Sequence, residues 1–170
     1  MLGITENYII TDHSCFYPES GGQVGDTGYI DNEKIIDTIK EQGVILHKVK
    51  NPKKFKKGQK VHLKVDKERR KQISMHHTCA HLLNAAARNV LGRHIWQTGS
   101  YKDENKGQLD LTHYKRITQD ELDNIEKKVN EYIRMNLPIK TEEMERDKAE
   151  EKMPLQHHRR GGFRAKPRIR

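Results

Sequence analysis

The periodicity of the apolar residues changes once along the chain, near Asp66, and this change constrains the fold more than any other feature. Before it, apolar residues come in short runs or alternate with polar ones, as in residues 61–65 (VHLKV), where a period of two predicts a strand. After it, apolar residues recur every three or four positions, which predicts a long amphipathic helix that ends near Gly92. The pattern therefore predicts an α+β fold.

Short strands separated by turns are predicted for the first part of the chain. Turn residues occur at Asp31-Asn32 and Gln42-Gly43, and the predicted strands cover residues 8–10, 28–30, 34–36, 44–46 and 61–65. Such a series favours a small β-barrel or a curled sheet. The lysine-rich stretch between Lys50 and Lys60 is interpreted as a solvated loop.

The second part is predicted to contain two helices and an antiparallel sheet. Strands are expected over residues 95–101 and 107–114, after the first helix. Residues 118–121 (TQDE) have the pattern of a capping box and begin a second amphipathic helix, which Pro138 ends. A further strand over 139–144 and a short helix over 147–152 complete the prediction.

Composition narrows the classes of partner. The net charge of +9 fits a polyanion such as nucleic acid. Only 33% of the residues are apolar, which indicates a thin core and a partner surface or a further segment. Cys15 and Cys79 do not suggest a disulfide framework. No apolar run reaches the length of a membrane span, and no signal peptide is apparent, so a cytoplasmic protein without membrane contact is expected.

Residues 76–81 (HHTCAH) place three histidines and a cysteine inside the predicted first helix. Because residues four apart share a helix face, His77 and His81 can both direct a ring nitrogen toward one zinc ion. Cys79 lies on the far side of the helix and is interpreted as a packed side chain, and His76 either packs or supports a ligand. Two ligands do not complete a tetrahedral site, so the spacing is compatible both with packed histidines and with half of a zinc site.

Residues 16–28 (FYPESGGQVGDTG) are rich in turn formers. Pro18 followed by Gly21-Gly22 predicts a tight turn whose backbone can approach another group closely. A compact connection between strands is the alternative interpretation.

Together these stretches resemble the editing region of alanyl-tRNA synthetases and, equally, the free-standing AlaX editing proteins. Residues 16–28 are similar to the family's glycine motif, and residues 76–92 (HHTCAHLLNAAARNVLG) resemble its zinc helix. Residues 94–100 (HIWQTGS), 109–116 (LDLTHYKR, an archaeal-like version) and 142–152 (EEMERDKAEEK) resemble the segments that follow. The resemblance implies a small N-terminal β-barrel with the glycine motif (1–66), an editing core with the zinc helix (67–156) and a basic tail (157–170).

The resemblance implies a zinc-dependent aminoacyl-tRNA deacylase that hydrolyses tRNA(Ala) mischarged with serine or glycine. His77 and His81 would be ligands of Zn²⁺, and Gln97 would orient the water or the amino acid by hydrogen bonds. Ser100 is a lesser candidate in the same cavity. The resemblance also assigns substrate or tRNA contacts to three neighbouring residues of the glycine motif, Gly21, Gly22 and Gln23. Lysines and arginines would hold phosphates.

The pattern departs from the family at its C-terminal end. The family completes its zinc site with a CxxxH motif, and here no cysteine follows Cys79. The expectation is a fragment whose final strands and remaining ligands are missing and come from the rest of the synthetase, in the same chain or a second one. His157 and His158 are alternative ligands. Three other functions stay open: a non-catalytic tRNA-binding module, a stand-alone AlaX-type trans-editing protein, and a structural zinc protein.

Overall fold

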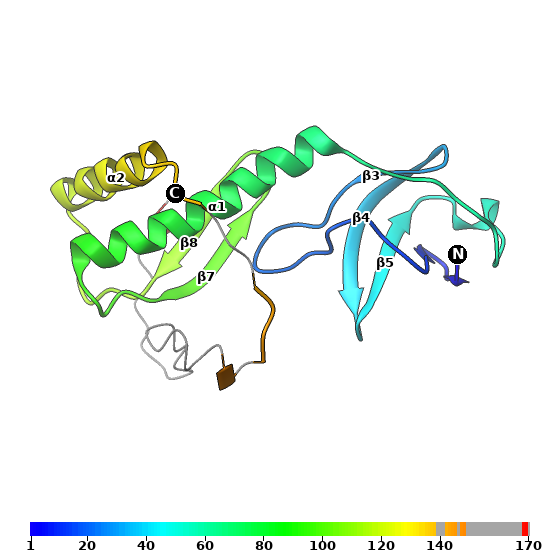
Figure 1. The fold of residues 1–170 in the computed structure, drawn as a ribbon, viewed down its shortest axis with the longest axis horizontal. Helices are drawn as coiled ribbons and strands as arrows, with labels where there is room; N and C mark the ends of the chain where they lie inside the picture. Colours follow the sequence, from blue (N-terminus) through cyan, green and yellow to red (C-terminus); the bar gives the residue numbers. More distant parts are fainter. Residues whose placement is uncertain (139–141, 146, 149–167, 170) are drawn as a thin grey trace. The chain divides into compact units, whose positions relative to one another are not determined.

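The computed structural model describes residues 1–138, 142–145, 147–148 and 168–169 (Figure 1). Two named helices, α1 (Lys67–Leu91) and α2 (Gln119–Arg134), accompany a six-stranded and a three-stranded sheet in these residues. The predicted α+β class is therefore confirmed. In the described part of the chain, no helix combines the length and the apolarity needed to cross a bilayer.

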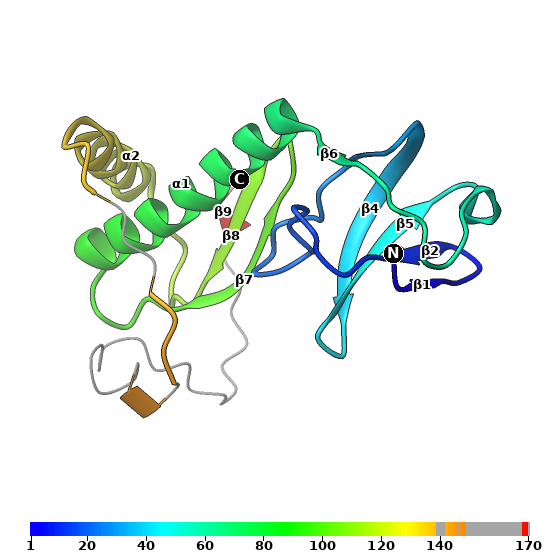
Figure 2. The same ribbon diagram turned by 45° about the vertical axis from the view of Figure 1, so that its right-hand side comes forward.

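The first 65 residues form one antiparallel sheet with the strand order β1-β2-β5-β4-β3-β6 (Figures 1 and 2). Its outer strands are β1 and β6, and no pairing between them appears among the described strands, so closure into a barrel is not shown. The predicted strands all fall on observed ones, which add β1 and extend β4 and β5. Their bounds are β1 (Gly3–Ile4), β2 (Tyr8–Ile10), β3 (Gly28–Ile30), β4 (Glu33–Glu41), β5 (Val44–Val49) and β6 (Leu63–Val65).

Side chains of the strands and of two connecting segments build an apolar core. It consists of Ile9, Phe16, Ile30, Ile35, Val49 and Phe55, each less than 9% exposed. The hairpin between β4 and β5 turns at Gln42 and Gly43, whose φ angles of +48° and +85° suit a two-residue hairpin loop. A short 3₁₀ helix, η1 (Pro52–Lys54), lies in the stretch predicted as a solvated loop.

Both helices begin with a side-chain cap. The carboxylate of Asp66 accepts a hydrogen bond from the backbone N–H of Arg69 at 3.1 Å, which caps α1. At the start of α2, Thr118 and Glu121 form the predicted capping box. The strong cap and the apolar stripe, with Ile125 and Val129 buried, explain why the sequence located this helix correctly.

The second sheet has the order β7-β8-β9, from β7 (Gln97–Lys102), β8 (Gly107–Leu111) and β9 (Arg168–Ile169) (Figure 2). The strands predicted over 95–101 and 107–114 correspond to β7 and β8. Of the strand expected over 139–144, residues 142–144 are described and form no strand, and 139–141 lie outside the described residues. Of the helix expected over 147–152, residues 147–148 are described and are helical, and 149–152 lie outside. His157 and His158 lie entirely outside the described residues.

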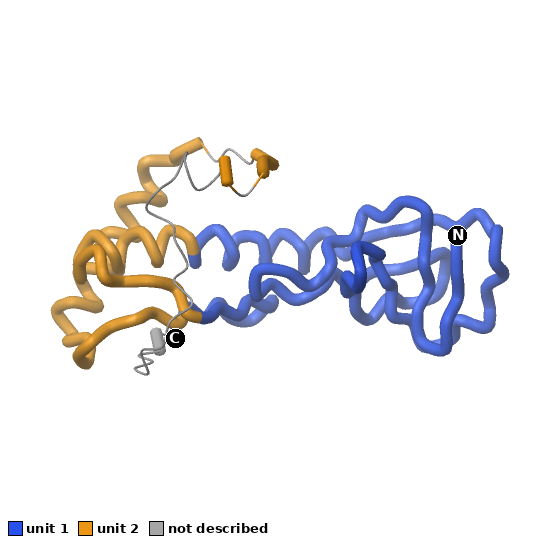
Figure 3. The backbone as a smooth tube through the Cα atoms, turned by 90° about the horizontal axis from the view of Figure 1, so that it is seen from below, with its two compact units in different colours: residues 1–80, 99–109, 170 blue, residues 81–98, 110–169 orange. Residues whose placement is uncertain are grey.

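The chain divides into two compact units (Figure 3). One contains residues 1–80 and 99–109, and the other contains residues 81–98 and the described residues from 110 onward. The division into the ranges 1–66, 67–156 and 157–170 stays a prediction.

Candidate functional site

A tight turn at Gly21-Gly22 is the centre of the candidate site. Two backbone hydrogen bonds join its flanking residues, from Ser20 N to Gln23 O at 3.1 Å and from Gln23 N to Ser20 O at 2.9 Å. Gly21 and Gly22 have φ angles of +59° and +75°, which side chains with a Cβ rarely adopt. A Cβ on Gly22 would lie 2.3 Å from the carbonyl oxygen of Ser100. The predicted tight turn is confirmed, and its close approach is to the backbone of β7.

Strand β7 holds this turn with hydrogen bonds from its backbone and from one side chain. The backbone N–H of Lys102 donates to Gly22 O at 2.7 Å, and Val24 N donates to Lys102 O at 3.1 Å. The ammonium of Lys102 donates to Gly21 O at 2.9 Å and to Ser100 Oγ at 2.7 Å. Ser100 Oγ in turn lies 3.4 Å from Gly21 O. These contacts bring Ser100 beside the glycine turn, as one site would require.

Lys102 is a buried cation, with only 2% of its surface exposed. Its two hydrogen-bond acceptors are a carbonyl and a hydroxyl oxygen, both neutral. Burial lowers the pKa of Lys102 below its ordinary value, because desolvation disfavours the charged form. The site therefore contains a buried amine whose charged form is disfavoured by desolvation.

His77 contacts the same turn from α1. Its Nδ1 lies 2.9 Å from Gln23 Oε1, and a Cβ on Gly21 would lie 3.3 Å from its Cε1. With a carbonyl oxygen as the partner, Nδ1 carries the proton and Nε2 carries the lone pair. Metal-bound histidines usually donate their second nitrogen in this way, which fixes the tautomer and the ring orientation. Gln23 is 3% exposed, so this acceptor is held in place.

His76 has a different environment from its neighbour. Its Nδ1 lies 2.7 Å from the carbonyl oxygen of Asp103, and its Nε2 lies 3.0 Å from Gln72 Nε2. Both ring nitrogens therefore have protein partners. Of the two interpretations of His76, the structure favours a packed residue.

Two other predicted site residues are His81 and Gln97. His81 follows His77 by one turn of α1 and is exposed, and Gln97 begins β7 and is partly buried. Both lie in the unit that contains residues 81–98, whereas Gly21, Gly22, Gln23, His77 and Ser100 share the other unit. Cys79 is exposed and is not the packed side chain that was expected.

The described residues 1–138, 142–145, 147–148 and 168–169 contain no cluster of three or more His, Cys, Asp or Glu side chains arranged to hold a metal. His77 and His81 remain the pair that the helix spacing offers.

The sequence interpretation missed Lys102. A signal for it existed, because Ser100 and Lys102 are two positions apart in a strand and so share one face. A lysine on the face that carries a candidate site residue is a candidate for the same site. Its burial could not be read from the pattern, since lysine is mostly an exposed residue.

Comparison with known proteins gives consistent results. A family model described as tRNA synthetases class II (A) matches residues 1–69. The chain is 43% identical over 152 residues to alanine-tRNA ligase of Methanococcus maripaludis, 44% over 156 residues to that of Methanothermobacter thermautotrophicus, and 45% over 159 residues to that of Saccharolobus islandicus. Each comparison covers 89% of this chain.

The chain spans about a sixth of the length of these relatives, 17–18% of each. The matched region includes most of the described residues, because only about a tenth of the chain is left uncovered. Over 89% of its length, the chain is thus homologous to a segment of alanine-tRNA ligases.

Proposed function

We propose that this chain is an aminoacyl-tRNA deacylase that hydrolyses the ester joining serine or glycine to tRNA(Ala). The observation that carries the proposal is the hydrogen bond between His77 Nδ1 and Gln23 Oε1 beside the glycine turn. Similarity to alanine-tRNA ligases supports the choice of substrate. An aminoacylation pocket shaped for alanine rejects glycine poorly, and serine differs by one hydroxyl, so a second, hydrolytic site meets a physical need.

His77 and His81 would hold Zn²⁺. The fit of His77 is supported by its oriented ring, whose Nδ1 is bonded to Gln23 while Nε2 carries the lone pair. When bound, zinc polarises a water or an ester carbonyl so that hydrolysis proceeds near neutral pH. Additional ligands would come from outside the described residues, in the rest of the synthetase or in a second chain.

The other residues would position the substrate. Gln97 would orient the water or the amino acid, as the sequence resemblance implies. Gly21 and Gly22 would contact the substrate or the tRNA end through their backbone, as the sequence resemblance implies. Lys102 would keep the turn and Ser100 in register through its bonds to Gly21 O and Ser100 Oγ. Its charge also favours the negative charge that develops during ester hydrolysis.

A non-catalytic tRNA-binding module is the second candidate. The observation that favours it is that the described residues contain no cluster of three metal ligands, and that only His77 and His81 of the three histidines on α1 are four positions apart. In either case the partner would be tRNA(Ala), in the cytoplasm. A stand-alone trans-editing protein of the AlaX type differs only in working without the ligase.

Hydrolysis of serine-charged tRNA(Ala) tests the proposal directly. We expect wild-type chain with added Zn²⁺ to release serine, and His77→Ala/His81→Ala to release it at the background rate. Bound zinc per chain is measured in the same samples. Cys79→Ala is the matched control, because Cys79 is exposed on the same helix between the two histidines.

Each outcome separates the candidates. If the wild type binds the tRNA but neither binds zinc nor hydrolyses the ester, the chain is a binding module. If Cys79→Ala removes activity as fully as the histidine variant does, the assignment of the two histidines as the ligand pair is wrong.

A further inference from the structure

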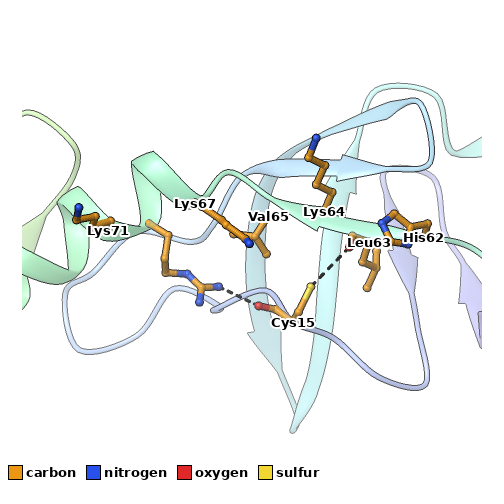
Figure 4. Close-up of a pocket in the computed structure, with 8 residues that line it drawn as sticks. Cys15, His62, Leu63, Lys64, Val65, Lys67 and Lys71 are labelled. Carbon is orange, nitrogen blue, oxygen red and sulfur yellow. Dashed lines mark hydrogen bonds between the residues drawn. The ribbon is translucent and has the colours of Figure 1, made fainter.

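A groove with a volume of about 590 Å³ lies where β6 leads into α1 (Figure 4). Its apolar lining is Cys15, Leu63 and Val65, and its cationic lining includes Lys64, Lys67 and Lys71. Leu63 and Val65 also pack against the sheet core, so they form the fixed inner wall. Lys67 and Lys71 add exposed ammonium groups to the lining, whereas Lys64 alternates with Leu63 and Val65 along β6 and its side chain points away from theirs (Figure 4). All of these residues lie within residues 1–80.

Arg70 also lines the groove, but its charge is already paired. Its guanidinium donates to Asp26 Oδ1 at 2.7 Å and to the carbonyl oxygen of Cys15 at 2.9 Å. Asp26 is 1% exposed, so this ion pair is a structural link between α1 and the N-terminal segment. Arg70 shapes the groove and adds no free charge to it.

The three lysines are different. Lys64, Lys67 and Lys71 are exposed, and none forms an ion pair within the part of the chain that the structure describes. Asp66 and Glu68 flank Lys67 in the sequence, but neither lines the groove, and Asp66 caps α1 through Arg69 N. The positive potential of the groove is therefore not cancelled locally.

The arrangement fits an extended polyanion better than a small anion. Lysines four residues apart on a helix are separated by about 6 Å along its axis, so Lys67 and Lys71 can contact different charges of one chain. In a small-anion site the donors converge on one buried point. Here the ammonium groups are exposed and do not converge. A second hollow of about 710 Å³ shares Cys15 and Leu63, and its lining includes both Lys60 and the acidic residue Asp12.

We propose that this groove binds the phosphodiester backbone of an RNA strand. Lys64, Lys67 and Lys71 would contact phosphates, and the wall of Leu63 and Val65 would accommodate a ribose or a base. The choice of RNA over DNA rests on the proposed function, whereas the groove and its charges do not. The contacts are to the backbone and carry no sequence specificity.

The test is the salt dependence of binding to an uncharged, fluorescently labelled tRNA(Ala) transcript. The groove variant is Lys64→Gln/Lys67→Gln/Lys71→Gln. The control is Lys53→Gln/Lys56→Gln/Lys57→Gln, which removes the same charge from exposed lysines that do not line the groove. Each lost phosphate contact lowers the slope of log K against log salt by about 0.7–0.9.

We expect the groove variant to lose roughly tenfold or more in affinity and about 2–3 in slope, with the control nearly unchanged. Equal losses in both variants would overturn the inference, since binding would then follow net charge alone. It would also be overturned if the wild type bound phosphatidylserine vesicles through the same lysines and bound no RNA.

Ester hydrolysis separates this inference from the proposed function. If RNA binding depends on the groove lysines but serine-charged tRNA(Ala) is not hydrolysed, the groove proposal is supported and the deacylase proposal is overturned. If the wild type hydrolyses serine-charged tRNA(Ala) and the groove variant binds RNA as well as the wild type, the deacylase proposal is supported and the groove proposal is overturned.

Discussion

The apolar core of the six-stranded sheet and the polar cluster at the glycine turn lie in the same compact unit but are built differently. The core is made by residues of one continuous stretch, from Ile9 to Phe55, in strands that mostly pair with near neighbours. The polar cluster joins Gly21, Gln23, His77 and Lys102, with 54 residues between Gln23 and His77 and 81 between Gly21 and Lys102.

Because they are built differently, the two regions should respond differently to amino-acid substitution. Apolar burial is non-directional, so the core responds to lost volume in proportion to the atoms removed. The cluster depends on directed hydrogen bonds between distant residues, so one altered group can change its geometry with little effect on the sheet. Variants in the two regions should therefore separate stability from function.

Gly22→Ala should have the largest effect. The added Cβ would meet Ser100 O at 2.3 Å in a backbone with φ of +75°, and a carbonyl in a paired strand cannot move away easily. We expect a loss of about 4 kcal/mol or more in the free energy of unfolding, with loss of ester hydrolysis. Chemical denaturation measures the first quantity.

Gly43→Ala is the matched control, because Gly43 has φ of +85° and nothing within 4 Å of a built Cβ. It should cost only about 1–2 kcal/mol. Similar losses at both glycines would show that backbone angle, and not the contact with β7, makes Gly22 necessary.

Ile35→Ala should have the next largest effect, and it should lower stability while leaving zinc binding unchanged. Ile35 is 0% exposed in the sheet core, so the truncation should cost about 2–5 kcal/mol of stability. Zinc affinity of the folded chain should stay within about twofold of the wild type, since Ile35 belongs to the apolar core of the sheet and not to the polar cluster. A fall in zinc affinity at temperatures well below unfolding would contradict the separation of the two regions.

Gln23→Leu should weaken zinc binding with a smaller change in stability. It removes the acceptor of His77 Nδ1, and loss of such a partner lowers metal affinity by about 10–100-fold. Isothermal titration with Zn²⁺ measures the change. Gln23→Glu restores an acceptor and should recover most of the affinity; if both variants behave alike, the hydrogen bond is not what orients His77.

Lys102→Met should have the smallest effect near neutral pH, about 1 kcal/mol or less, because relief from burying a charge offsets the lost hydrogen bonds. Burial lowers the pKa of Lys102 from its ordinary 10.5. Between the lowered pKa and 10.5 the unfolded chain binds more protons, so wild-type stability rises with pH there.

Measured against Lys102→Met, the wild type should therefore gain stability as the pH increases toward 10.5, and lose that gain as the pH falls through the lowered pKa. Denaturation curves of both proteins across this range give the difference. A difference that does not change with pH would mean that Lys102 titrates alike in the folded and unfolded chain.

The sequence by itself determined where most of the helices and strands lie, and it proposed His77 and His81 as a metal-ligand pair. Period-two alternation, turn glycines and two helix caps are local signals, so they located the strands, α1 and α2 within a few residues. The resemblance to the editing family singled out Gly21, Gly22, Gln23 and His77, which the fold then brought together. It also singled out His81 and Gln97, whose roles stay predictions.

Only the tertiary structure decided that Lys102 is buried at the turn, that Gln23 orients His77, and that His76 is satisfied by Gln72 and Asp103. These facts depend on contacts between segments far apart in the chain. A pattern along the sequence reports which residues share a face, but burial and hydrogen bonding depend on what the fold places against that face.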